Sequence, residues 1–230
     1  MGEYNQRLVW DKIADQWYEF RHYPLPEVKD FSFFVARQPI ELNRKNKSLK
    51  KNILDVGAGC GRNLLPFKDH NLFAIDFSKE MIKQTKRYSK KFSLDIKAIK
   101  ASATDIPFDD NKFDAIICIA LLPCLKKGDR EKCLEEMKRV LKPNGYMLIS
   151  VWNRWQMRFF PNNILFSNIY VPWHRRTEIL KRYYHLFTEG ELKKLIEKDG
   201  LKIIKIFRDK NYKGFKAFSP NIFAVIQKPK

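Results

Sequence analysis

Three glycines and two aspartates near residue 60 have types and spacing suited to binding a ligand that carries a ribose. Asp55 opens the segment Asp-Val-Gly-Ala-Gly-Cys-Gly, in which Gly57, Gly59 and Gly61 alternate with other small residues. Glycines allow a sharp turn and let a ligand approach the main chain, and the first N–H groups of a following helix are free to bind it. Asp76 follows about 20 residues on, where a carboxylate can accept hydrogen bonds from both ribose hydroxyls.

The spacing of these glycines separates them from two other ligand-binding loops. Gly-x-Gly-x-Gly differs from the Gly-x-Gly-x-x-Gly of dinucleotide-binding proteins and from the Gly-x-x-x-x-Gly-Lys-[Ser/Thr] of phosphate-binding loops. The alternative interpretation is a packing turn of an α/β protein that binds no ligand. The acids on either side of the turn, Asp55 and Asp76, favour a ligand.

The elements that must position these residues alternate along the chain. Strands are expected over 52–56, 72–76, 94–100, 113–119, 146–152, 201–207 and 221–227, and helices after the glycines, from Ser78 to about 91 and over 129–141. Residues 113–119 are mostly apolar, as in a central strand of a parallel sheet. This alternation predicts an α/β fold with a doubly wound, mostly parallel sheet.

Three segments lie outside this alternation. Helices are expected over 5–22 and on to about residue 40, followed by a polar, basic connection over 43–51. Residues 153–187 read as an insertion, and Thr188-x-x-Glu191 resembles a capping box that opens a helix ending at Gly200. We expect one domain over 1–230, with 1–50 as a helical lid, because 230 residues suit a single large core.

Composition excludes several classes of protein. Hydrophobic residues make up 44% of the chain, which argues against a disordered or fibrous protein. No apolar stretch approaches a membrane span and the N-terminus lacks an apolar signal core, so we expect a cytoplasmic protein. The cysteines, at 60, 118, 124 and 133, have no C-x-x-C spacing, so neither a disulfide framework nor a metal site is expected.

The net charge indicates the class of partner. The chain has 45 lysines and arginines against 26 aspartates and glutamates, a formal net charge of +19. Residues 1–50 carry +2, residues 51–150 carry +6 and residues 151–230 carry +11. A protein this basic usually meets a polyanion, most often nucleic acid. A lysine-rich proteome is the alternative, although thermophiles enrich lysine and glutamate together.

Five segments over residues 51–151 together resemble the class I S-adenosylmethionine (SAM)-dependent methyltransferases: ILDVGAGCGRN, AIDFS, ASATDIPF, FDAIICIALL and RVLKPNG. The resemblance implies a Rossmann-like, seven-stranded sheet with the last strand antiparallel, and SAM as cofactor. Ser102 stands where the family usually has an adenine-binding aspartate. The cofactor-binding residues that the resemblance implies are Trp17, Arg21, Asp55, Gly57, Gly59, Gly61, Asp76, Phe77, Ser102, Ala103, Ile119 and Ala120.

The two flanks narrow the resemblance. VWDKIADQWYEFRHYPLPEV and RYYHLFTEGELKKLIEKDG resemble the tRNA wobble-uridine methyltransferases, which esterify a 5-carboxymethyl group in the anticodon. The resemblance implies RNA as partner, tRNA before rRNA, with no DNA and no membrane. It also implies Arg130, Arg182, Tyr184 and His185 near the substrate, and it leaves open whether a small activator subunit is needed.

One segment departs from that family. Pro123 and Cys124 stand where it usually has a pair of histidines. A Pro-Cys dipeptide at this place also occurs in RNA cytosine-C5 methyltransferases, where the thiolate attacks the ring. A buried, inert cysteine is the favoured alternative for Cys124. Methylation of an rRNA cytosine, a small-molecule methyltransferase and a non-catalytic subunit therefore remain as alternatives.

The insertion combines aromatic and basic residues. Residues 152–187 contain ten aromatic residues, six basic ones and a single acid. Aromatic faces stack on unpaired bases, and arginine binds phosphate in a bidentate manner. A lid whose rings pack inward is the alternative. The substrate-binding candidates in this region are Trp152, Asn153, Trp155, Arg175, Arg176 and Tyr184.

Overall fold

The computed structural model describes residues 5–39, 50–175 and 177–230. The helices are α1 (Gln6–Glu19), α2 (Pro26–Ala36), α3 (Lys79–Lys91), α4 (Lys127–Val140), α5 (Asn162–Leu165) and α6 (Glu189–Lys198), with short 3-10 helices η1 (Arg62–Phe67), η2 (Leu122–Cys124), η3 (Met157–Phe159) and η4 (Lys216–Phe218). The strands are β1 (Asn52–Val56), β2 (Asn71–Asp76), β3 (Ile96–Lys100), β4 (Phe113–Ile119), β5 (Leu141–Trp152), β6 (Asn168–His174), β7 (Ile179–His185), β8 (Lys202–Arg208) and β9 (Asn221–Gln227).

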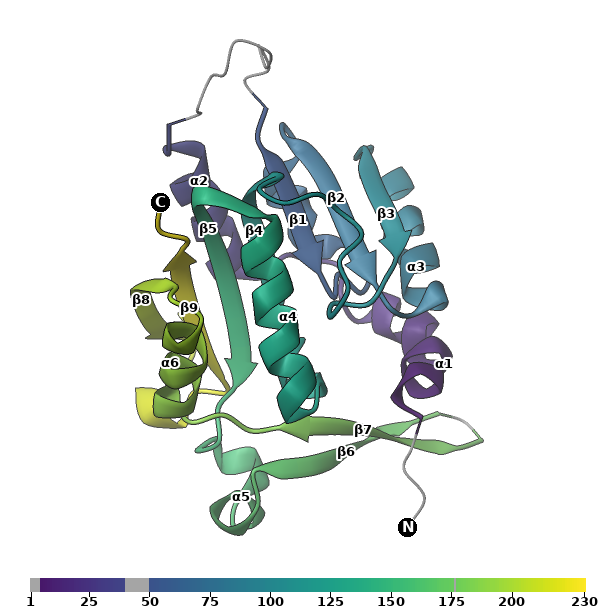
Figure 1. Cartoon of the computed structure of the whole chain (residues 1–230). Coiled ribbons are helices and arrows are strands. Elements are labelled where there is room, and N and C mark those ends of the chain that lie inside the picture. The colour runs from purple at the N-terminus through teal and green to yellow at the C-terminus, as the bar shows by residue number, and fades with distance from the viewer. Residues whose placement is uncertain (1–4, 40–49, 176) are drawn as a thin grey trace.

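The main sheet confirms the predicted fold class. Its seven strands have the order β3-β2-β1-β4-β5-β9-β8. β1 to β5 pair in parallel, whereas β9, the last strand of the chain, is antiparallel to both of its neighbours. The carboxyl ends of β1, β2 and β5 point to the same edge, beneath which α1 and the β6–β7 hairpin lie (Figure 1).

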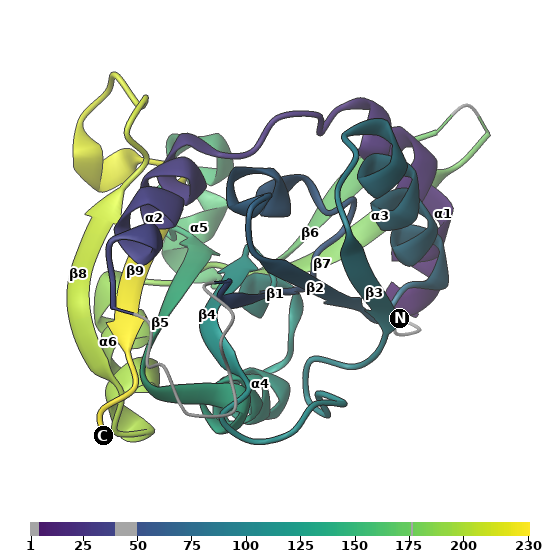
Figure 2. The ribbon, with the colours of Figure 1, turned by 90° about the horizontal axis from the view of Figure 1, so that it is seen from above.

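Helices cover both faces of the sheet (Figure 2). α4 and α6 pack on one face and α2 and α3 on the other, because the strands alternate apolar side chains between two cores. In β1, for example, Leu54 and Val56 join the first core and Ile53 joins the second.

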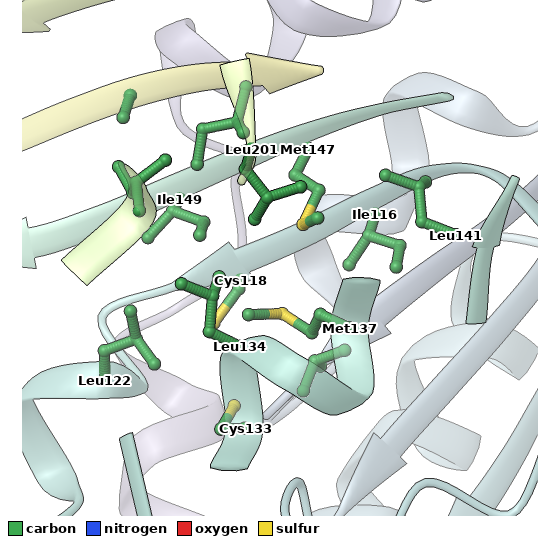
Figure 3. Packing of buried hydrophobic residues seen from close by; sticks show 14 of the residues in the cluster. Ile116, Cys118, Leu122, Cys133, Leu134, Met137, Leu141, Met147, Ile149 and Leu201 are labelled. Carbon is green, nitrogen blue, oxygen red and sulfur yellow. The ribbon is translucent and has the colours of Figure 1, made fainter. Parts of the chain in front are cut away.

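The core under α4 shows this packing at close range (Figure 3). Cys133 and Leu134 lie on the same face of α4 as Met137, because they precede it by four and three residues. They pack against β4 and β5 side chains such as Cys118 and Ile149, all fully buried. This rigid layer fixes the carboxyl end of β4, where chemistry is expected.

Several local expectations need correction. The helix after the glycines is the short 3-10 helix η1, and Pro66 inside it has no N–H to continue an α-helical ladder. β5 begins at residue 141 and not at 146. Thr188 is confirmed as the N-cap, since its side chain accepts from the backbone N–H of Glu191. The Glu191 carboxylate contacts His185, and no bond back to Thr188 completes the capping box among the described residues. The predicted connection over 43–51 lies mostly outside the described residues.

The predicted insertion contains structure of its own. β6 and β7 form a separate antiparallel two-stranded sheet that crosses beneath the main one. Within the described residues, no helix is long and apolar enough to cross a membrane.

Candidate active site

A cavity of about 1070 Å³ opens at the carboxyl edge of the main sheet. Its floor consists of residues at the ends of β1 to β5 or just beyond them, and its roof of residues from α1, the segment just after it and the β6–β7 hairpin. Floor residues include Gly57, Gly59, Asp76, Phe77, Ser102, Ala103, Ile119, Ala120, Cys124 and Trp152. Roof residues include Trp10, Trp17, Arg21, Tyr170, Tyr183 and Tyr184.

The glycine turn presents bare backbone to this cavity. Gly57 and Gly59 have φ of +72° and +56°, a left-handed conformation that favours glycine. A Cβ at Gly57 would lie 2.9 Å from a Leu121 methyl group, and one at Gly59 would lie 3.3 Å from the Trp17 indole nitrogen. Gly57 N–H also donates to the carbonyl of Ile75 (2.9 Å), which ties the turn to β2. Side chains are therefore excluded where a ligand would lie.

Asp76 ends β2 and faces the glycine turn. Its carboxylate accepts from the backbone N–H of Gly59 (3.0 Å) and of Ser78 (2.9 Å). Burial raises the pKa of Asp76 to about 6, although these two N–H donors pull it the other way. Two lone pairs remain for a ligand's hydroxyl groups, with the Phe77 ring beside them on the cavity wall.

Asp55 lies beneath the turn and not on the cavity wall. It is buried, and its Oδ2 atom has no hydrogen-bond partner among the described residues. Burial, assisted by the nearby charge of Asp76, raises the pKa of Asp55 to about 8. This acid therefore carries its proton at neutral pH.

Within the roof, side chains of α1 hydrogen-bond to the β6–β7 hairpin. The Trp173 indole N–H donates to Gln16 (2.7 Å), and Gln6 Oε1 accepts from the Tyr183 backbone N–H (3.0 Å). Arg21 lies 4.8 Å above the Trp17 ring. Two segments far apart in the sequence thus close the cavity together.

Two of the predicted stacking residues are stacked on each other. The Trp152 and Tyr184 rings lie 3.9 Å apart, nearly parallel at 9°. Trp10 meets Tyr184 edge to face at 6.5 Å. These rings form a continuous wall of the cavity, so a base would stack beside this pair and not between its members.

Arg182 is a buried cation on the inward face of the hairpin. It is 6% exposed and lies 4.7 Å from the Trp173 ring. Its Nη1 donates to Tyr184 Oη (3.0 Å), its Nε has no partner, and no carboxylate pairs with it among the described residues. Burial lowers the pKa of Arg182 from its usual value. A buried charge without an opposite charge is costly, so the site is suited to an anionic ligand.

His185 and Arg130 form a separate cluster behind the hairpin. His185 Nε2 lies 2.6 Å from Glu191 and its Nδ1 lies 2.7 Å from Asn168. Arg130 lies 3.6 Å from the same Glu191 carboxylate. Both side chains thus pair with Glu191, and neither lines the cavity.

The end of β4 borders the cavity through backbone and a thiol. Ala120 has φ of +56°, and its N–H donates to the carbonyl of Ser150 (3.1 Å). The Cys124 thiol lies on the wall and donates to Ala120 O (3.4 Å). Burial raises the pKa of Cys124 to about 12, so this thiol is not a thiolate at neutral pH. Pro123 is buried and lies off the wall.

These features fit SAM. The bare glycine turn leaves room for a ligand against the main chain, Asp76 offers acceptors for ribose hydroxyls, and Phe77 offers an apolar face for a base. The volume exceeds that of most single-ligand sites, about 300–1,000 Å³. It therefore leaves space for a second reactant.

Comparison with known proteins agrees with this geometry. Residues 53–145 match a family of methyltransferase domains. The chain contains a class I SAM-dependent methyltransferase domain. The matched segment includes the glycine turn, Asp76 and the end of β4.

Two relatives are similar to this chain over more than residues 53–145. The tRNA (carboxymethyluridine(34)-5-O)-methyltransferase of Schizosaccharomyces pombe is 28% identical over 221 residues, which cover 86% of this chain and 88% of the relative. The mouse tRNA N(3)-cytidine methyltransferase METTL2 is also 28% identical, over 172 residues that cover 69% of this chain. The match spans only 42% of the mouse protein.

Solved structures share the fold. The CcbJ methyltransferase of Streptomyces caelestis has a TM-score of 0.73 at 16% identity, covering 99% of this chain and all of that one. A putative methyltransferase of Haloferax volcanii, solved in complex with the Trm112 methyltransferase activator, has a TM-score of 0.64 at 18% identity and covers 98% of both chains.

The methyltransferase cavity brings together many of the predicted site residues and not others. Those on the wall are Trp17, Arg21, Gly57, Gly59, Asp76, Phe77, Ser102, Ala103, Ile119, Ala120, Cys124, Trp152 and Tyr184. Those off the wall are Asp55, Gly61, Pro123, Arg130, Asn153, Trp155, Arg175, Arg182 and His185. Arg176 lies outside the described residues.

Several off-wall residues have structural contacts instead. The Asn153 amide donates to the carbonyl groups of Ala217 (2.7 Å) and Ser219 (2.8 Å), which holds the last loop. Arg175 pairs with Glu178 near the hairpin turn (3.1 Å), and the Trp155 ring is exposed. A Cβ at Gly61 would lie 2.9 Å from the Thr85 methyl group, so this glycine allows α3 to pack.

Some residues that line the cavity are not among those predicted from the sequence. Trp10, Asn63, Tyr170, Tyr183 and Asn221 line the cavity without having been predicted. Trp10 had a usable signal, because it lies seven residues before Trp17 and so on the same face of α1. The others depend on how distant segments meet.

Proposed function

We propose that this chain transfers a methyl group from SAM to tRNA, at the carboxylate side chain of the wobble uridine. The observation that carries the proposal is Arg182, a buried guanidinium with no carboxylate partner among the described residues. Its Nη1 donates to the hydroxyl of Tyr184 (3.0 Å), and Tyr184 lies on the cavity wall. A carboxylate acceptor would supply the missing negative charge, whereas a neutral cytosine ring would not.

The relatives support the same substrate class. The fission yeast enzyme, named for carboxymethyluridine, covers most of this chain and is itself mostly covered. The N3-cytidine enzymes share the tRNA substrate but not the anionic acceptor.

The residues on the wall suit this reaction without acid–base machinery. When bound, SAM supplies an activated methyl group. Asp76 and the glycine turn would hold the cofactor, with Ile119 and Ala120 bordering the transfer. A carboxylate is already ionised at neutral pH and needs no general base, and no histidine lines the cavity among the described residues. The chain's task is to align the acceptor with the methyl group and to exclude water.

The rRNA-cytosine alternative requires a thiolate at Cys124. The raised pKa of this thiol argues against that chemistry. The basic last third of the chain, at +11, favours RNA over a small-molecule acceptor. A cytoplasmic location and the absence of DNA substrates stay predictions.

The experiment is methyl transfer followed by nucleoside analysis. The protein is incubated with tritiated SAM and tRNA from a strain lacking wobble-uridine esterification, alone and with a Trm112-type subunit. We expect label in the methyl ester of 5-carboxymethyluridine, and a large loss with Arg182→Gln but not with Arg37→Gln, an exposed control on the end of α2. Label in 3-methylcytidine, or none in either arm, would overturn the proposal.

A further inference from the structure

A second, smaller cavity lies between η3–α5 and β6, next to the active site. It has a volume of about 280 Å³. Its lining residues are Arg158, Phe159, Phe160, Asn162, Ile169, Tyr170, Val171 and Pro172. None of these is acidic, three are aromatic and one is a cation.

Two of its rings are unusually open to solvent. Phe160 is 59% exposed and Tyr170 is 51% exposed. A large exposed ring beside a concave surface is typical of a binding site. Phe159 is more buried, and its ring lies nearly parallel to that of Trp152, at 6.0 Å and 22°. The Arg158 guanidinium lies 5.4 Å from the centroid of the Phe159 ring. The groove therefore offers stacking surfaces together with a positive charge.

The groove adjoins the active site. Tyr170 lines both cavities, and its ring meets that of Tyr183, another roof residue, edge to face at 5.8 Å. Trp152 lines the main cavity and backs onto Phe159 of the groove. A strand with one nucleotide in the main cavity would thus carry its neighbour toward the groove.

We propose that this groove binds a nucleotide flanking the modified one, in an unpaired RNA strand. The base would stack on Phe160 and Tyr170, Arg158 would bind a phosphate, and the Asn162 amide would contact the base edge. The volume is near the lower limit for a ligand site and suits one base. This inference rests on the proposed function for the identity of the RNA.

The charge of the surroundings favours RNA over a protein partner. Residues 151–230 contain 17 basic and 6 acidic side chains. Exposed apolar side chains do lie close by, at Met157, Leu165 and Phe166. A protein partner seated on them is the competing outcome of the test.

The test compares two variants with a matched control. Phe160→Ala combined with Tyr170→Ala removes both exposed rings, and Arg158→Gln removes the cation. Phe33→Ala removes an equally exposed ring from α2, on a different part of the molecule. Circular dichroism and thermal midpoints verify that each variant folds.

Affinity is measured with an unpaired RNA oligonucleotide and with an anticodon stem-loop, by fluorescence anisotropy over a range of salt. We expect the double variant to lose about tenfold in affinity for both RNAs, and Arg158→Gln to reduce the slope of log affinity against log salt by about 1. Kinetics use Arg158→Gln and the single variant Phe160→Ala, because neither side chain lines the main cavity. With the stem-loop as substrate, KM should rise in both and kcat should stay, and with the isolated nucleoside neither constant should change.

The outcomes separate this inference from the proposed function. If the wild type methylates the wobble uridine and the double variant binds RNA as well as Phe33→Ala does, the groove does not bind a nucleotide and this proposal is wrong. If wobble-uridine methylation fails but the double variant still loses RNA affinity, the groove is right and the substrate assignment is not. If the double variant keeps its RNA affinity but loses an oligomeric state or a co-purifying protein that the wild type has, the groove binds a protein and the RNA proposal is wrong.

Discussion

The floor and the roof of the active-site cavity are built in different ways. The floor comes from short turns after neighbouring strands and is held by backbone hydrogen bonds, such as that from Gly57 to Ile75. The roof comes from two segments far apart in the sequence, α1 and the β6–β7 hairpin, and is held by side chains such as Gln16 and Trp173. We infer that the floor decides whether the cofactor binds and that the roof decides how the cavity opens.

The largest effect is expected at the centre of the floor. Gly59→Arg would place a side chain against Trp17 and impose left-handed backbone on arginine. We expect SAM affinity to fall by at least about 100-fold, measured by calorimetry. Gly190→Ala is the control, because a Cβ there meets no atom within 4 Å. Unchanged SAM affinity in Gly59→Arg would mean that SAM does not bind against the glycine turn of the floor.

The next effect concerns Asp76. Asp76→Asn removes charge-assisted hydrogen bonds, so we expect roughly 10- to 100-fold weaker SAM binding at pH 7.5. In the wild type, affinity should fall as pH falls through about 6, because the carboxylate then gains a proton. The variant should lack this fall. An identical pH profile in both proteins would mean that Asp76 does not bind the cofactor as a carboxylate.

Asp55 gives a smaller effect, on stability. Its pKa is raised from 3.8 to about 8. Between these values the folded state binds more protons than the unfolded state, so this group makes stability fall as pH rises from about 4 to 8. Asp55→Asn should lack that contribution and melt about 4 °C above the wild type at pH 8. Thermal midpoints across this range measure it, with Asp109→Asn on an exposed loop as control.

The roof should respond locally. Gln6→Ala removes the acceptor of the Tyr183 backbone N–H and the donor to Lys181 O. We expect about fivefold to tenfold faster amide exchange along β7, with SAM affinity unchanged. Hydrogen exchange read by mass spectrometry tests this. A loss of SAM affinity equal to that of Asp76→Asn would erase the distinction between floor and roof.

The smallest effect is expected at the edge of the roof. Lys12 pairs with Glu178 at 2.7 Å, but both side chains are substantially exposed. Exposed ion pairs contribute little because water and salt screen them. Lys12→Ala should therefore leave the thermal midpoint and the SAM affinity unchanged within error. A clear loss in either would show that the roof depends on this pair.

The same division explains what could be predicted from the sequence. The floor follows from a local motif, since Gly57, Gly59 and Asp76 need only two neighbouring parallel strands to meet. Wall positions in the roof depend on contacts between residues more than 150 positions apart, such as Gln6 with Tyr183. No local pattern specifies such a contact. Trp152 and Tyr184 were expected to grip a base, yet they stack on each other because β5 and β7 approach there.

The connection between α1 and the hairpin has a consequence for synthesis. α1 is translated more than 150 residues before Trp173 and Tyr183, which it contacts. Contacts so distant in sequence form slowly, since a long loop must close first. A nascent chain therefore holds an open floor until the β6–β7 hairpin has been made.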